Sequence, residues 1–297
     1  MHAMLLVVSI ILNVLSCGLL RNDFCKKEIE NQADLHAFNA LSSIVSALTL
    51  FIVAAVSRSL CMPSFYTIAL GTVFGIATAL CAVLHMRALE NGPLSYTNII
   101  TSCAMVIPAL SGMVFYGEAI LPGQFIGIAL MVASFVCAVD TKNEESGTSV
   151  KWLLLCLGSF MFSGSVGIMQ KVHQTSPHKD ELGMFLVIAF IVSALFSLFY
   201  MLCLKKQSPL TLTSRAKTSK FVWVSLVCGA AFALVNQINM YLAGAMPAII
   251  FYPVVNGGGM ILTTAAGLLL LKEKLSRRQT VGLVLGGAAI ILLCGIF

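Results

Sequence analysis

The stretch VFGIATALCAVLHMRALENGP, residues 73–93, returns later in the chain as VCGAAFALVNQINMYLAGAMP, residues 227–247. At a constant offset of 154, seven positions carry the same residue in both stretches. The matches include residues that apolar sequence does not readily pair by chance: Gly75, Met86 and Pro93 meet Gly229, Met240 and Pro247. We infer an internal duplication, and this duplication decides the expected fold.

A second block of sequence repeats in the same order. GEAILPGQFIGIAL begins at Gly117, and KEKLSRRQTVGLVL begins at Lys272. The offset here is 155, so a gap of one residue relates the two blocks. The matched pairs are Glu118 with Glu273, Gln124 with Gln279, Gly127 with Gly282 and Leu130 with Leu285.

The composition indicates a membrane protein. Of the 297 residues, 59% are hydrophobic and 10% are charged, whereas soluble domains carry about 25% charged residues. A helix needs about 20 mostly apolar residues to cross a bilayer, and continuous apolar runs favour helices over barrel strands. We therefore predict an all-α polytopic protein of a bacterial-type plasma (inner) membrane. Its ten expected transmembrane helices are residues 3–20, 37–57, 64–86, 94–116, 120–139, 151–170, 182–204, 220–242, 247–271 and 279–296.

The first apolar run is interpreted as a span and not as a signal peptide, because it lacks a basic leading region and a small-residue cleavage site. The polar stretch DTKNEESGT, residues 140–148, then divides the spans into five and five. We expect a first repeat over residues 1–140, a linker over 141–149 and a second repeat over 150–297. Because five is odd, equivalent spans cross the membrane in opposite directions, so the repeats are inverted.

The basic residues predict the orientation of the spans. Lysine and arginine concentrate in cytoplasmic loops. Of the 18 such residues, 15 lie in or beside odd-numbered loops, and three, Arg58, Lys171 and Lys179, lie in even-numbered loops. Odd-numbered loops are therefore expected to be cytoplasmic, with both termini outside.

Several functional classes lack support in the sequence. The ten cysteines are scattered and form no CxxC pair, so we interpret them as packing residues and expect no metal and no cofactor. The basic residues sit in short stretches between spans, which argues against nucleic acid as a partner. Neither an HExxH motif nor a pair of intramembrane aspartates suggests an enzyme.

The repeated blocks resemble the drug/metabolite transporter superfamily, specifically its ten-span EamA-like branch. The resemblance rests on Tyr116 to Glu118 followed by Pro122, Gln124 and Gly127, on the related KEKLSRRQTVG, and on ALENGPLSYTN at residues 88–98. It implies a secondary transporter of small polar or amphipathic metabolites, with a central site between the halves. Relatives with ten spans usually have cytoplasmic termini, which differs from the orientation that the charges predict.

Polar side chains inside spans are costly unless they find partners or line a wet cavity. Asn236 and Asn239 share a helical face, and the repeat places Asn239 opposite His85. The alternative for each polar residue is hydrogen bonding between packed helices. The predicted substrate-binding or pathway residues are Asn13, Asn39, His85, Asn98, Thr101, Ser102, Asn236, Asn239, Tyr252 and Asn256. By contrast, Glu118 and Glu273 lie near span ends and are interpreted as interface or cap residues, so no carboxylate site for a coupling ion is expected at mid-membrane.

Together these features predict alternating access of two inverted repeats around a small-molecule metabolite within the lipid bilayer. Neutral amides and hydroxyls suit a zwitterionic or neutral polar substrate. Proton coupling through His85, exchange and facilitated diffusion remain open, as do import, efflux and oligomeric state. The alternatives are a lipid-handling flippase-type subunit and a non-transporting membrane partner protein, which would have a dry, apolar centre.

Overall fold

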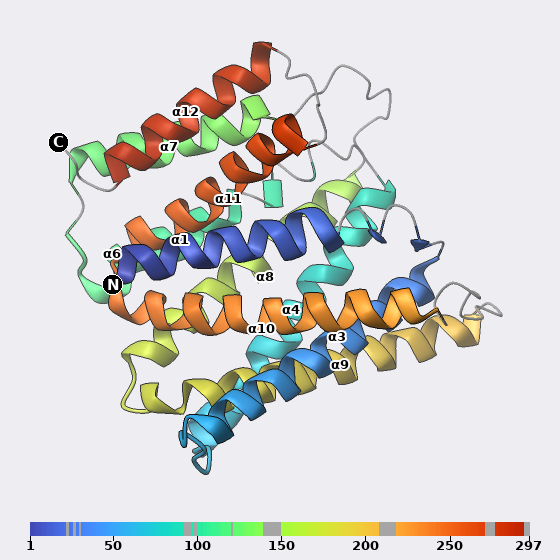
Figure 1. Cartoon of the computed structure of the whole chain (residues 1–297). Coiled ribbons are helices and arrows are strands. Elements are labelled where there is room, and N and C mark those ends of the chain that lie inside the picture. Colours follow the sequence, from blue (N-terminus) through green and yellow to red (C-terminus); the bar gives the residue numbers. More distant parts are fainter. Residues whose placement is uncertain are drawn as a thin grey trace. The chain divides into compact units, whose positions relative to one another are not determined.

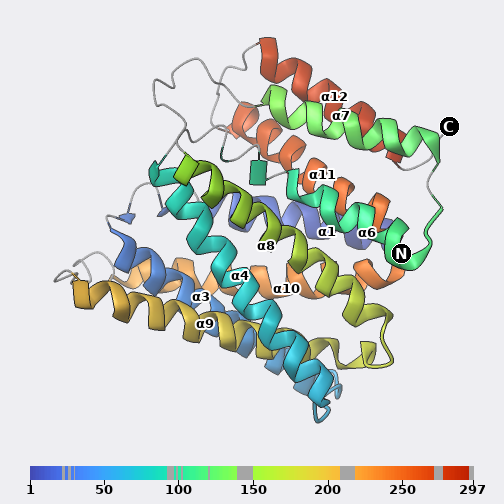
Figure 2. The ribbon, with the colours of Figure 1, turned by 180° about the vertical axis from the view of Figure 1, so that it is seen from behind.

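A computed structural model describes residues 1–21, 24–25, 28–29, 31–91, 97, 100–101, 103–119, 121–138, 150–207, 218–270 and 277–293. Every regular element in these ranges is helical, as Figures 1 and 2 show from two sides. The prediction of an all-α protein is therefore confirmed for the described residues. The expected linker, residues 141–149, lies outside them.

Among the described residues, six helical stretches are long and apolar enough to cross a membrane, which identifies an integral membrane protein. Each coincides with a predicted span. The first combines α1 with a terminal π-helical segment, which together cover His2–Arg21. The others are α3 (Gln32–Val56), α4 (Phe65–Asn91), α8 (Val150–Thr175), α9 (Leu182–Gln207) and α10 (Ser219–Ala245).

Four further apolar helices lie in the remaining predicted spans. Their described apolar parts are shorter than a full crossing. The predicted number of ten transmembrane helices therefore stays a prediction. These helices are α6 (Val106–Tyr116), which follows a 3₁₀ turn at Cys103–Met105, and α7 (Pro122–Ala138), α11 (Ala248–Leu270) and α12 (Arg277–Leu293).

Among the helix boundaries that differ from the hydropathy pattern, two have a local reason. Helix α3 begins at Gln32, five residues before the expected span, because the Asn31 side chain caps it and accepts a hydrogen bond from the Asp34 N–H at 2.8 Å. Helix α8 continues to Thr175, beyond the expected end at residue 170, and so includes Lys171. The buried Lys171 charge is accommodated there because it pairs with Glu118.

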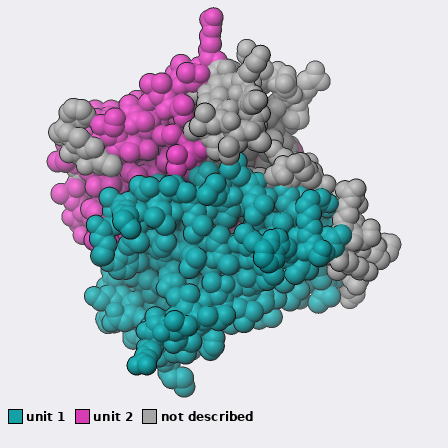
Figure 3. Space-filling view, viewed as in Figure 1, with its two compact units in different colours: residues 1, 3–79, 172–241 teal, residues 2, 80–171, 242–297 magenta. Residues whose placement is uncertain are grey.

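The chain forms two compact units (Figure 3). Unit 1 consists of residues 1, 3–79 and 172–241, and unit 2 consists of residues 2, 80–171 and 242–297. Each unit combines segments from both predicted repeats. The units describe how the chain packs, whereas the repeats describe how the sequence is duplicated, so the division into repeats stays a prediction.

Within unit 1, α3 packs along α9, as both views of the ribbon show. Gly75 of α4 lies against α9, and Gly229 of α10 lies against α3. A methyl group added to Gly75 would collide with a backbone carbonyl of α9, and one added to Gly229 would lie 2.5 Å from a carbonyl of α3. The contacted residues are Ala189 and Val192 for Gly75, and Ser42 and Val45 for Gly229.

Within unit 2, α7 packs along α12. The Ser134 hydroxyl of α7 donates to the Gly282 carbonyl of α12 at 2.6 Å. In the other direction, a methyl group added to Gly127 of α7 would lie 3.2 Å from the Ala289 carbonyl of α12. Small residues thus allow the two backbones to approach closely, which is how membrane helices commonly associate.

Candidate functional site

A buried ion pair joins the ends of three helices in unit 2. The Lys171 ammonium of α8 lies 2.9 Å from the Glu118 carboxylate, and the two side chains are 7% and 15% exposed. The second carboxylate oxygen accepts the backbone N–H of Ala248, the first residue of α11, at 2.7 Å. We call this arrangement the Lys171–Glu118 clamp.

The position of Glu118 follows from the turn that ends α6. Gly117 adopts a left-handed conformation with φ 60°, and the Glu118 N–H then bonds back to the Gly112 carbonyl. A carboxylate at a helix N-terminus satisfies an unpaired N–H group and meets the positive end of the helix dipole. The interpretation of Glu118 as a cap residue is therefore confirmed. Glu273, its repeat equivalent, lies outside the described residues.

Lys171 is a functional candidate that sequence reasoning missed. It was assigned to a loop, whereas it lies inside a candidate membrane span. Besides Glu118, its ammonium donates to the Met246 carbonyl at 2.9 Å and lies 5.7 Å from the centre of the Tyr116 ring. The available signal was the absence of glycine and proline between residues 168 and 175, which favours a helix that continues past the apolar run.

Helix α11 makes a second contact with α8, about a turn away from the clamp. The Tyr252 hydroxyl donates to the Gly167 carbonyl at 2.5 Å, and Tyr252 is buried. Asn256 follows one turn later, donates to the Tyr252 carbonyl at 2.8 Å and is exposed. Pro253 lies between them, inside the helix. The predicted residues Tyr252 and Asn256 are thus linked through the helix that the clamp holds.

His85 and Thr101 are also brought together in unit 2. The His85 Nδ1 atom lies 3.1 Å from the Thr101 hydroxyl, which in turn donates to the Thr97 carbonyl at 3.0 Å. Both residues are half-buried. The remaining predicted residues of this region, Asn98 and Ser102, lie outside the described residues.

In unit 1, the predicted asparagines make three separate contacts. The Ser9 hydroxyl donates to Asn239 at 2.5 Å, and Arg21 donates to Asn39 at 3.0 Å. Asn236 donates to the Phe232 carbonyl of its own helix at 2.9 Å. Asn13 is half-buried on α1. These contacts therefore do not bring the four asparagines together in one cluster.

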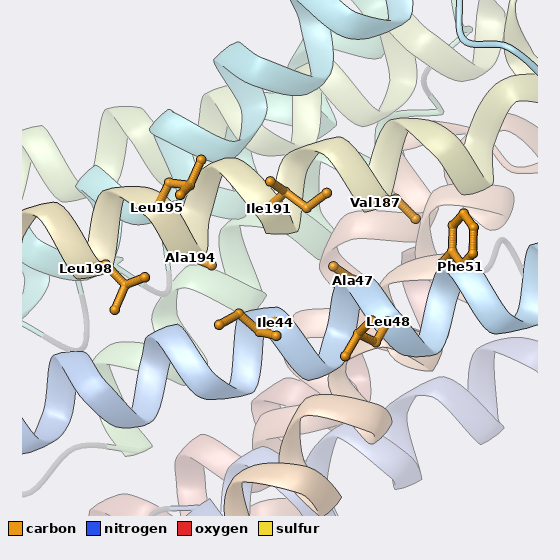
Figure 4. A pocket seen from close by; sticks show the side chains of 9 residues that line it. All are labelled: Ile44, Ala47, Leu48, Phe51, Val187, Ile191, Ala194, Leu195 and Leu198. Carbon is orange, nitrogen blue, oxygen red and sulfur yellow. The ribbon is translucent and has the colours of Figure 1, made fainter.

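Two hollows of different chemistry also lie in unit 1. The first is a groove of about 350 Å³ between α3 and α9, and Figure 4 shows that only carbon side chains line it. Such a surface suits lipid chains and offers a polar ligand no hydrogen bond. The second hollow, described below, has both polar and apolar walls.

The part of the chain that the structure describes contains no group of three or more His, Cys, Asp or Glu residues that could hold a metal ion. Apart from the Arg21 contact with Asn39, the polar contacts above join neutral groups or the two charged partners of the clamp. Their chemistry suits binding and conformational change, and we assign no covalent step to them.

Comparisons with known proteins agree with this architecture. Residues 5–139 match the EamA-like transporter family. The threonine/homoserine exporter RhtA of Escherichia coli K12 is 29% identical over 108 residues, which cover 36% of this chain and 37% of the exporter. The same protein from E. coli O157:H7 matches equally.

The matched segment therefore spans little more than a third of the exporter's length. A solved crystal structure of another protein covers 99% of this chain and 96% of its own, with a TM-score of 0.74 and 12% identity. At that identity the likeness shows the fold alone. These matches support membership of the drug/metabolite transporter superfamily, with an EamA-like segment at residues 5–139.

Proposed function

We propose that this protein is a secondary transporter that moves a small polar metabolite across the membrane by alternating access. The observation that carries the proposal is the match of residues 5–139 to a family of transporters. The comparisons point to a transporter rather than an enzyme. Six apolar helices long enough to span a bilayer agree with that role.

The packing within each unit supports two inverted repeats, residues 1–140 and 150–297. In unit 1, the contact of Gly75 with α9 has a counterpart in the contact of Gly229 with α3. Gly229 follows Gly75 by the repeat offset of 154 residues. The contacted residues of α9, Ala189 and Val192, follow those of α3, Ser42 and Val45, by a constant 147 residues. In unit 2, Ser134 contacts Gly282, and Gly127 lies close to Ala289. The offset of 155 residues relates Ser134 to Ala289 and Gly127 to Gly282, so the second contact is the first with the two helices exchanged. Reciprocal contacts of this kind are what a two-fold axis between equivalent helices produces.

Helix α11 is the element that we expect to move. Its start is held by the Lys171–Glu118 clamp, and Tyr252 fastens it to α8 a short distance further on. Pro253 interrupts its backbone hydrogen bonding, and Gly257 to Gly259 lower its helix propensity. A helix fastened at one end and weakened just beyond can bend there, which suits a gate.

The substrate that fits best is a zwitterionic metabolite of amino-acid size, moved outward. The neutral amides and hydroxyls of Asn239, Thr101 and Asn256 suit such a molecule, and one relative is an exporter of threonine and homoserine. Lys171 could bind an anion, but its pairing with Glu118 leaves the clamp without net charge. Proton coupling would use His85, which meets Thr101.

Reconstitution in liposomes tests the proposal directly. Vesicles that contain the purified protein and are preloaded with radiolabelled threonine should release it faster than preloaded vesicles without protein. An outward gradient of a competing amino acid should change that rate. Asn256→Ala should reduce the flux, whereas Leu195→Ala, in the apolar groove of α9, should not. Movement of a fluorescent phospholipid between leaflets, without any flux of small solutes, would instead favour the flippase alternative.

A further inference from the structure

A hollow at one end of unit 1 has the chemistry of a ligand site. Its volume is about 580 Å³, within the range of pockets that bind small molecules. We call it the loop pocket. Its polar walls include Gln174, Lys179, Asp180 and Gln237, and its apolar walls come from α1, α3, α9 and α10.

Two opposite charges line the loop pocket side by side. Lys179 and Asp180 are neighbours in the 3₁₀ turn Lys179–Glu181, and both are exposed. Neither side chain has a hydrogen-bond or ion-pair partner among the described residues. An ammonium and a carboxylate that face one hollow and do not pair with other groups can each bind the opposite charge of a ligand.

The turn that carries these charges is held in place from both sides. The Glu181 carboxylate accepts hydrogen bonds from the Ser64 N–H and hydroxyl, both at 2.8 Å, and lies 3.1 Å from the His178 ring. The Gln174 amide donates to the Lys179 carbonyl at 3.3 Å. A turn fixed in this way spends little conformational entropy when a ligand binds.

We propose that the loop pocket binds a zwitterion, with the ligand's anionic group on the Lys179 ammonium and its ammonium group on the Asp180 carboxylate. Gln237 of α10 offers an amide to the ligand's polar remainder. As a binding step for the transported molecule, this site rests on the proposed function. The same charge pattern also occurs in the headgroup of phosphatidylethanolamine, so the ligand is either a free amino acid or that lipid.

The free ligand is tested with threonine and two analogues that each lack one charge. Threoninamide lacks the carboxylate, and N-acetylthreonine lacks the ammonium group. The full-length protein should bind threonine about fivefold more tightly than either analogue, the value expected for an exposed ion pair. Lys179→Gln should make threonine and threoninamide equal, and Asp180→Asn should make threonine and N-acetylthreonine equal. Lys151→Gln, which removes an exposed lysine outside the pocket, is the control.

The lipid is tested in nanodiscs of phosphatidylethanolamine or phosphatidylcholine, with native mass spectrometry to count retained lipids. Phosphatidylcholine has no ammonium N–H to donate to Asp180 and should be retained less. If the ligand is the lipid, Asp180→Asn should remove that preference, and threonine and its analogues should bind alike. Both arms support a zwitterion site and differ only in its source.

The proposal is overturned if both variants retain wild-type affinity for every ligand and wild-type lipid retention. The liposome assay distinguishes failure of the proposed zwitterion site from failure of the proposed transport function. If the wild type exports threonine and the two variants export it equally well, the loop pocket is not part of the pathway. If no solute is exported yet the variants lose their ligand selectivity, the pocket stands and the proposed function does not.

Discussion

Breaking the Lys171–Glu118 clamp from one side should cost more free energy than removing it altogether. Glu118→Gln keeps the shape and still offers an oxygen to the Ala248 N–H, but it removes the carboxylate charge that pairs with the Lys171 ammonium. Because Lys171 is 7% exposed, little water reaches that charge. Removing one partner of a buried pair costs about 3–5 kcal/mol, and we expect about 3 kcal/mol here.

Removing the lysine instead of the carboxylate should destabilise the protein less. Lys171→Met leaves the Glu118 carboxylate with the Ala248 N–H and the positive end of α11, which together retain about 1 kcal/mol of favourable interaction. We expect a loss of about 2 kcal/mol. In the double variant no charge remains unpaired, and apolar contact replaces the pair at a cost of about 1 kcal/mol. The coupling energy between the two sites is then about 4 kcal/mol.

Unfolding in mixed micelles with increasing SDS, followed by circular dichroism, measures these differences. Lys220→Met is the matched control, because Lys220 forms an ion pair with Glu28 at 2.6 Å while 61% exposed. Exposed pairs contribute about 0–1 kcal/mol, so that variant should unfold nearly as the wild type does. The clamp does not hold a buried charge pair if Glu118→Gln behaves like the control, or if the double variant loses as much stability as the two single variants combined.

Three further predictions follow from named contacts. Gly229→Ala places a methyl group against the backbone of α3 and should destabilise the protein by about 2 kcal/mol in the same unfolding assay. Gly287→Ala, in open space on α12, should instead stabilise it by up to about 1 kcal/mol. Equal effects of the two substitutions would contradict the close packing of α10 on α3. His85→Ala and Asn239→Ala should each lower flux in liposomes about tenfold, because Thr101 and Ser9 each lose one hydrogen-bond partner. Unchanged flux in both variants would remove these residues from the pathway. In a variant whose only cysteine is the exposed Cys61, a membrane-impermeant maleimide should label intact cells, and labelling only after lysis would reverse the predicted orientation.

Much of the fold could be predicted because lipid restricts what a spanning segment can be. Each long apolar run had to satisfy its own backbone hydrogen bonds, so hydropathy was enough to place α3, α9 and α10. Helix ends were harder to predict from the sequence, since they depend on single side chains. The cap at Asn31 and the continuation of α8 through Lys171 moved two boundaries away from the apolar runs.

The candidate site was harder to predict than the fold, because helical periodicity shows which residues share a face of a helix but not which residues of other helices they contact. The shared face of Asn236 and Asn239 was visible from their spacing, but no sequence pattern indicated that Asn239 would contact Ser9 of α1. Likewise, the repeat compared His85 with Asn239, whereas His85 contacts Thr101 in its own half of the chain. Symmetry relates equivalent environments, and two equivalent residues need not touch.

The placement of Lys171 also bears on the orientation of the chain. A lysine buried in an ion pair gives no topological signal, because the positive-inside rule concerns basic residues in short loops. With Lys171 assigned to α8, only Arg58 and Lys179 remain in even-numbered loops, so the charge asymmetry increases. On that orientation, the turn that carries Lys179 and Asp180 lies outside the cell. Molecules leaving through an exporter would then meet the loop pocket last, and a weak, exposed ion-pair site is suited to that position because it can release its ligand quickly.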